Sequence, residues 1–201
     1  ALESIIELID AGAFGSGFGS VSADAGADAA LVHTGQAAML LQGSWVYGTF
    51  KQDAPDFVAE GNLGFLNFPA ADGGEGDPAN VVGNPANYWS VSADADEEVQ
   101  ELAIQYLNEY NLNDEMVDSF LEMGAIPAVE GLEDKFVGLD DEDFLSFAYE
   151  MVLDAPHFQL SWDQALAPAP AQELLTNLSQ IFLKEIEPAD FVTNMNATLD
   201  S

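Results

Sequence analysis

The spacing of apolar and polar residues predicts a helix-rich chain. In several segments apolar residues recur every three or four positions, as Leu2, Ile5 and Ile9 do, and this spacing is typical of an amphipathic helix. Glycine, proline or acidic residues stand at many of the predicted helix ends. The predicted helices cover residues 2–11, about 22–33, 45–50, 97–110, about 113–123, 144–152, 174–182 and 188–199.

Three short segments are typical of strands. Residues 37–42 (AAMLLQ) and 63–68 are short apolar stretches, and residues 88–92 (YWSVS) alternate between polar positions and aromatic or β-branched ones. Three strands are too few to complete the sheet of an α/β protein. The pattern therefore predicts an α/β, helix-rich fold that corresponds to half of a larger protein.

The charge balance narrows the classes of ligand. The chain carries 36 acidic residues against 3 lysines and no arginine, which gives a net charge of −33. Such a surface repels nucleic-acid phosphates and anionic lipids, and it has few groups that could hold an anionic substrate. Neutral polar molecules, apolar molecules and cations remain. The absence of cysteine excludes disulfides and thiolate metal sites.

Residues 31–50 (LVHTGQAAMLLQGSWVYGTF) carry the clearest motif, with Gly35, Ala-Ala-Met at 37–39 and Gly-Ser-Trp at 43–45. This segment resembles a signature of the extracellular solute-binding proteins of sugar ABC importers, the family that includes maltose-binding protein. In that family a helix ends at a glycine, an apolar strand follows, and Gly-x-Trp opens a short helix at the ligand cleft.

The later segments resemble the family in the same order. They are FLNFP (65–69), VVGNPANYWSVSA (81–93), EEVQELAIQYLNEY (97–110), GAIPAVEG (124–131) and EIEPADFVTNMNATLD (185–200). The resemblance implies a periplasmic-binding-protein-like fold of two lobes, of which this chain is the carboxy-terminal half. Residues 1–84 would begin the carboxy-terminal lobe, 85–130 would add a strand and helices to the other lobe, and 131–201 would return.

The resemblance also implies a function. Family members bind a sugar between their lobes, close on it by a hinge, and deliver it to the membrane permease subunits of the importer. We therefore expect a non-enzymatic binder of a neutral oligosaccharide, without cofactor or metal, outside the cytoplasm as a cell-surface lipoprotein or in a periplasm. The missing amino-terminal half would complete the cleft. A dimer of the chain is another way to cover its apolar surface.

Aromatic residues near the family's cleft positions are the first candidates for ligand contact. A sugar presents an apolar C–H face that stacks on a flat ring. By resemblance, Trp45 at the cleft helix and Trp162 near the return to the carboxy-terminal lobe would supply such rings. Tyr47 could line the same wall as Trp45. The alternative role for each of these three residues is ordinary packing in the core.

Polar side chains near these rings would bind the sugar hydroxyls. Gln159 and Asp163 flank Trp162 and have suitable chemistry, although an acidic residue in this chain is otherwise a solvated surface charge. Asn84 and Trp89 lie around the family's crossover strand. Trp89 could equally be buried between layers, and Asn84 between Gly83 and Pro85 could be a turn residue.

Two other classes of function stay open. A glycosidase needs two carboxylates, and among so many acidic residues no pair stands out. A non-catalytic acidic interaction domain is the second alternative. The acidic clusters at 93–98 and 139–144 lack the ligand order of an EF-hand. We interpret the first as a helix cap and the second as a solvated helix start.

Overall fold

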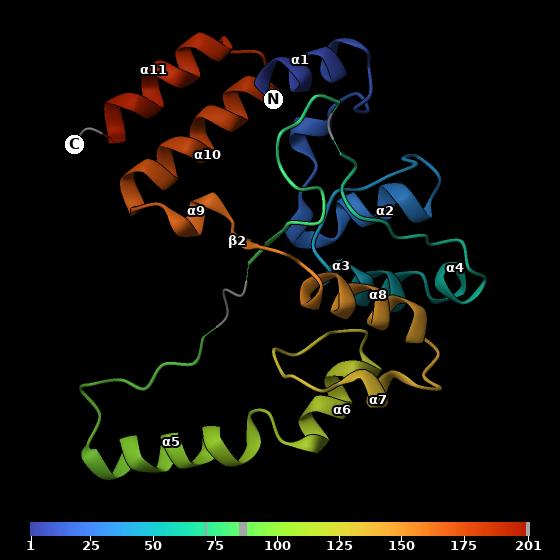
Figure 1. Ribbon diagram of the computed structural model, residues 1–201, viewed down its shortest axis with the longest axis vertical. Coiled ribbons are helices and arrows are strands. Elements are labelled where there is room, and N and C mark those ends of the chain that lie inside the picture. The colour runs from blue at the N-terminus through green and yellow to red at the C-terminus, as the bar shows by residue number, and fades with distance from the viewer. Residues whose placement is uncertain (71, 85–87, 200–201) are drawn as a thin grey trace. The chain divides into compact units, whose positions relative to one another are not determined.

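The computed structural model describes residues 1–70, 72–84 and 88–199, and most of its regular structure is helical (Figure 1). The helices are α1 Leu2–Asp10, α2 Ala27–His33, α3 Val46–Asp53, α4 Pro55–Ala59, α5 Glu97–Tyr110, α6 Asp114–Glu122, α7 Glu133–Phe136, α8 Glu142–Leu153, α9 Trp162–Ala165, α10 Pro168–Phe182 and α11 Pro188–Leu199. Two 3₁₀ turns, Phe18–Ser20 and Ala23–Ala25, precede α2. The strands β1 Val81–Gly83 and β2 Phe158–Leu160 pair in a parallel two-stranded sheet.

Each predicted helix has a counterpart, but the predicted caps form only in part: Asp96 stands at the N-cap of α5 without a side-chain capping hydrogen bond. Asn113 caps α6 because its side-chain oxygen accepts a hydrogen bond from the Met116 amide at 2.9 Å. Gly124 follows α6 with φ of 76°, a left-handed conformation that glycine adopts without strain. The predicted helix at about 22–33 is shorter than expected, because the helix proper begins at Ala27.

The three predicted strands are wrong. Segments 37–42, 63–68 and 88–92 form no β ladder and run as irregular or extended backbone. A strand needs a neighbour to satisfy its amide and carbonyl groups, and these segments have none among the described residues. Several of their apolar side chains, including Met39 and Leu66, are exposed, whereas Leu63 is partly buried against the core. In the described residues the structure is therefore a helix-rich α/β chain with one small parallel sheet.

The chain divides into two compact units. The terminal unit contains residues 1–39 and 160–201, and the central unit contains residues 40–159. These bounds differ from the predicted lobe ranges 1–84, 85–130 and 131–201. Those ranges describe the lobes of the predicted two-lobe protein, and their assignment stays a prediction.

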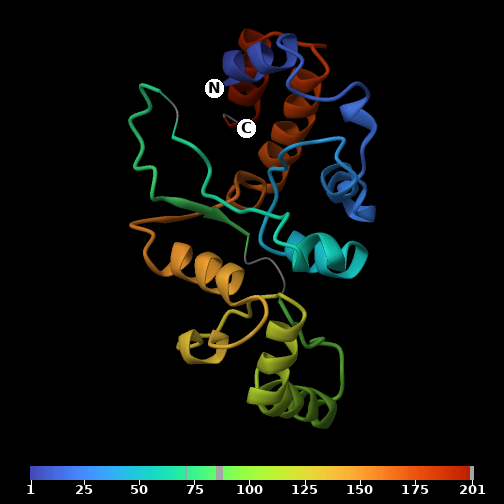
Figure 2. The same ribbon diagram turned by 90° about the vertical axis from the view of Figure 1, so that its right-hand side faces the viewer.

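The terminal unit is built around α10. This helix packs against α9, α11 and α1 (Figures 1 and 2), and it buries Leu174 and Ile181. Its buried Asn177 accepts a hydrogen bond from the Asn194 side chain of α11 at 2.7 Å. Lys184 pairs with Asp10, the last residue of α1, at 2.5 Å. Both ends of the sequence therefore contribute to one small domain.

The central unit holds the larger apolar core. Side chains from α3, α6, α7 and α8 meet there, and the same helices lie close together in both views (Figures 1 and 2). The buried members are Tyr47, Val117, Leu121, Leu132, Phe136, Phe144, Leu145, Ala148 and Tyr149. The longer helix α5 of the same unit has no fully buried residue. The packing therefore fixes α3 and α8 firmly, and it leaves α5 largely open to solvent.

Candidate functional site

Trp45 lies on the surface of the central unit, one residue before α3. Its side chain is 61% exposed. A Cβ atom built on Gly43 would overlap the Trp45 indole, so the ring folds back over backbone that carries no side chain. Glycine at 43 therefore lets the indole adopt this position.

Tyr47 lies in the core of the central unit. Its ring stacks on Phe144 with centroids 3.8 Å apart and planes 6° apart. Its hydroxyl donates a hydrogen bond to Oδ1 of Asp141 at 2.6 Å. The structure thus gives Tyr47 the packing role that was the alternative to a ligand contact. Tyr47 is the second residue of α3, two positions after Trp45, and its side chain anchors the start of α3 to α8.

A charged group completes this anchor. Lys51 of α3 pairs with Oδ2 of Asp141 and donates a hydrogen bond to the carbonyl oxygen of Glu122 at 2.7 Å. Asp141 is only 8% exposed, so the interpretation of segment 139–144 as a wholly solvated helix start is wrong at this residue. Burial, and then the hydrogen bond to Asp141, raises the pKa of Tyr47 above its ordinary range. We call Tyr47, Lys51 and Asp141 the anchor triad.

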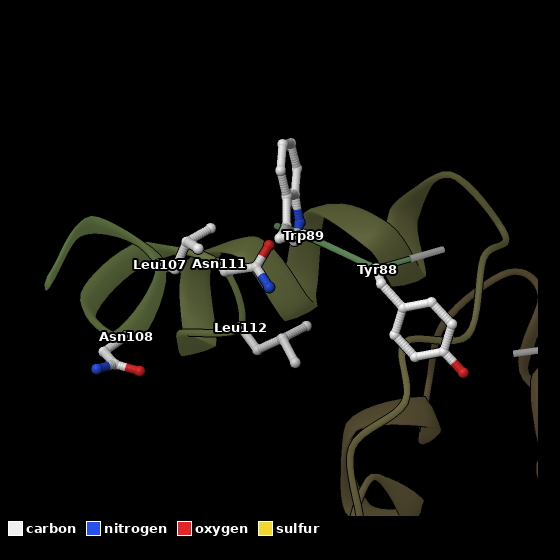
Figure 3. A pocket seen from close by; sticks show the side chains of 6 residues that line it. All are labelled: Tyr88, Trp89, Leu107, Asn108, Asn111 and Leu112. Carbon is white, nitrogen blue, oxygen red and sulfur yellow. The ribbon is translucent and has the colours of Figure 1, made fainter. Parts of the chain in front are cut away.

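Trp89 lines an open hollow of about 460 Å³ in the central unit (Figure 3). The side chains that line it are Tyr88, Trp89, Leu107, Asn108, Asn111 and Leu112. The first two come from the extended segment after β1, and the others from the end of α5 and the turn that follows it. Tyr88 and Trp89 point in different directions from consecutive extended residues (Figure 3).

The described lining of this hollow carries no charged side chain, although the chain as a whole has 36 acidic residues. Aromatic rings supply apolar faces, and carboxamides can both donate and accept hydrogen bonds. This combination suits a neutral ligand with hydroxyl groups. We call this surface the neutral hollow.

Sequence reasoning found Trp89 but missed its partners in the neutral hollow. Asn108 and Asn111 are three positions apart, which places them near each other at the end of the helix. In a helix whose other polar side chains are mostly carboxylates, two uncharged amides at this spacing were a usable signal. Asn84 is exposed at the end of β1 and does not line the hollow.

Trp162 is the first residue of α9, and it is 62% exposed. Asp163 follows it in the first turn and is exposed as well. Gln159 lies in β2 and is also exposed. Trp162 and Asp163 belong to the terminal unit, whereas Trp45, Asn84, Trp89 and Gln159 belong to the central unit.

Within the described ranges, no cluster of three or more histidine or acidic side chains is arranged to hold a metal ion. No helix found there has the length and hydrophobicity required to span a bilayer. No known protein-family model matches the chain, and no curated protein matches its sequence.

Proposed function

We propose that the chain is the carboxy-terminal half of the sugar-binding component of an ABC importer, and that its ligand is a neutral oligosaccharide. The observation that supports this most is the exposure of all three tryptophans, with Trp89 72% exposed. Tryptophan is among the more buried residue types on average. Indole rings held at the surface are suited to stacking on the C–H face of a sugar ring.

The neutral hollow and the overall charge support the same class of ligand. Asn111 provides a donor and an acceptor for hydroxyl groups near the Trp89 ring, and Asn108 provides the same groups farther along the hollow (Figure 3). The net charge of −33 disfavours phosphorylated or carboxylated sugars. Together these features favour an uncharged polyol over an anionic one.

The exposed apolar segments support the proposed missing half. Two apolar side chains in each of these segments are exposed to solvent: Met39 and Leu41 in segment 37–42, and Leu66 and Phe68 in segment 63–68. Each segment has the composition of a buried strand but no strand partner among the described residues. An amino-terminal half that supplied neighbouring strands would bury this surface and satisfy the backbone.

In this proposal the protein acts by binding and closure, without covalent chemistry. The two lobes would close on the sugar by a hinge, and the closed form would dock on the permease subunits. The protein would work outside the cytoplasm, as a lipoprotein or in a periplasm. Turnover of a chromogenic glycoside, lost on one carboxylate substitution, would instead favour the glycosidase alternative.

The test is a titration of the full-length protein with a panel of neutral oligosaccharides, followed by intrinsic tryptophan fluorescence. We expect one class of sugar to give a saturable change. Trp45→Ala and Trp162→Ala should each weaken binding about tenfold or more, as the removal of a central aromatic anchor does. Leu175→Ala removes an exposed apolar side chain of α10 outside the candidate positions and serves as the control.

Because folding is checked separately, a negative result of this experiment can be interpreted. Both tryptophans are exposed, so their substitution should leave the circular dichroism spectrum unchanged. If no sugar alters the fluorescence of a protein shown to be folded, the sugar proposal fails and the interaction-domain alternative gains support. A sugar response that survives both substitutions would refute Trp45 and Trp162 as ligand contacts and would leave the neutral hollow around Trp89 as the site.

A further inference from the structure

A second hollow lies between α5 and α6 of the central unit. Its volume is about 250 Å³, and its lining is formed by Tyr106, Tyr110, Asn113, Glu115, Met116 and Ser119. It shares no lining residue with the neutral hollow. The two helices that form it follow one another closely in the chain (Figures 1 and 2). Its chemistry is different, because it combines two phenol rings with a carboxylate. We call it the tyrosine hollow.

The two rings form an exposed aromatic pair. Tyr106 and Tyr110 lie one turn apart on α5, with centroids 5.3 Å apart and planes 28° apart. Their side chains are 61% and 51% exposed. The face of an aromatic ring carries negative electrostatic potential, so a cation near the centroid is attracted to it. The pair therefore offers ring surface that a ligand can reach.

The Asn113 and Ser119 side chains of the tyrosine hollow are already engaged within the protein. The Asn113 side chain accepts a hydrogen bond from the Met116 amide and donates one to the carbonyl oxygen of Glu109. The Ser119 hydroxyl donates to the carbonyl oxygen of Glu115 at 2.9 Å. The groups that remain for recognition are the two tyrosine rings with their hydroxyls, the Met116 thioether and the Glu115 carboxylate. The ring faces and the carboxylate are well suited to an apolar cation.

Glu115 has no cationic partner among the described residues. The chain has no arginine, and its three lysines pair with other carboxylates. The nearest of these in sequence, Lys135, pairs with Asp114 and Asp118, the former next to Glu115 in the chain. A carboxylate in the first turn is also favoured by the helix dipole. The rings beside it therefore distinguish this carboxylate from the others.

We propose that the tyrosine hollow binds a small organic ammonium cation, of the quaternary type. Such a cation carries its charge on methyl groups and needs no hydrogen-bond acceptors, so rings and one carboxylate can hold it. Inorganic divalent cations need several oxygen ligands, which this lining does not supply. The net charge of −33 also raises the local concentration of cations. This site is independent of the proposed sugar site.

The test follows the methyl resonance of Met116 while choline is added at constant ionic strength. We expect a saturable shift at Met116 and none at Met151 or Met195, which lie on α8 and α11. The uncharged analogue 3,3-dimethyl-1-butanol has nearly the same shape as choline and serves as the matched ligand. It should bind much more weakly, because it lacks the charge that the rings and the carboxylate attract.

Matched variants assign the contacts. Tyr106→Leu removes the ring and should weaken choline binding about 2- to 30-fold, whereas Tyr106→Phe keeps the ring and should bind like the unaltered protein. Glu115→Gln should weaken binding several-fold. Glu101→Gln removes the same charge from an exposed position on α5 outside the hollow, and it should have little effect.

Three results would overturn the proposal. The first is equal shifts with choline and its uncharged analogue, which would describe an apolar hollow. The second is a shift that sodium chloride reproduces, which would describe a general counterion effect of an acidic protein. The third is unchanged affinity in Tyr106→Leu, shown by circular dichroism to be folded.

Discussion

The anchor triad predicts that the effect of Tyr47→Phe on stability depends on whether Asp141 is present. In the unaltered protein, Tyr47→Phe removes a hydrogen bond to a charged acceptor and should destabilise the central unit by roughly 1.5–3 kcal/mol. Asp141→Ala deprives the buried hydroxyl and Lys51 of their shared partner. Lys51 is partly exposed, so this loss should be about 2–4 kcal/mol, below that of a fully buried ion pair.

The double variant is the informative one. Without Asp141, the Tyr47 hydroxyl is a buried donor that has lost its hydrogen-bond acceptor. Its removal then costs nothing or is slightly favourable, because an unsatisfied buried group destabilises the native state. Tyr47→Phe should therefore be destabilising in the unaltered protein and neutral or stabilising in the Asp141→Ala background. The coupling energy is the difference between the two costs and should be at least about 1.5–3 kcal/mol.

Urea unfolding monitored by circular dichroism measures these free energies, and hydrogen exchange at the amides of α3 and α8 assigns the change to the central unit. The second measurement is needed because a chain with two units need not unfold in one step. Asp140→Ala, at the exposed neighbouring carboxylate, is the control and should change stability by less than about 0.5 kcal/mol. Equal costs of Tyr47→Phe in both backgrounds would refute the reasoning.

Three further predictions follow from the same structure. Because the pKa of Tyr47 is raised in the folded protein, the unfolded chain loses this proton first, so stability should fall as pH rises above about 10. Tyr47→Phe should flatten that decline in urea titrations across alkaline pH, whereas Tyr88→Phe, at an exposed tyrosine, should not. Gly43→Ala places a methyl group where the Trp45 indole lies, so it should shift the tryptophan emission; Gly64→Ala, which meets nothing within 4 Å, is the control that should leave the emission unchanged. Added sodium chloride should raise the melting temperature by screening a net charge of −33, and a melting temperature that does not depend on salt would contradict this.

The helices could be predicted because their information is local. The apolar spacing of segments such as 97–110, and caps such as Asn113, act within a few residues of each other. The strands could not be predicted in this way. An apolar run such as 37–42 specifies only a preference for extended backbone. A β ladder forms only where a second strand lies beside the first.

The candidate site was predicted in part for the same reason. Exposed Trp45 and its glycine are close in sequence, so their relation was visible in the motif. Asp141 contacts Tyr47 across 94 positions of the chain, and no local pattern indicates such a pairing. The sequence therefore predicts Asp141 only as one solvated charge among many.

The terminal unit is formed by two segments that are far apart in sequence, and this has a consequence for folding during synthesis. Residues 1–39 pack with residues 160–201, so the contacts of α1 with α10 have very high contact order. During synthesis the central unit emerges as one uninterrupted stretch and can complete its core first. Residues 1–39 must wait, without these partner helices, until residues 160–201 have been synthesised.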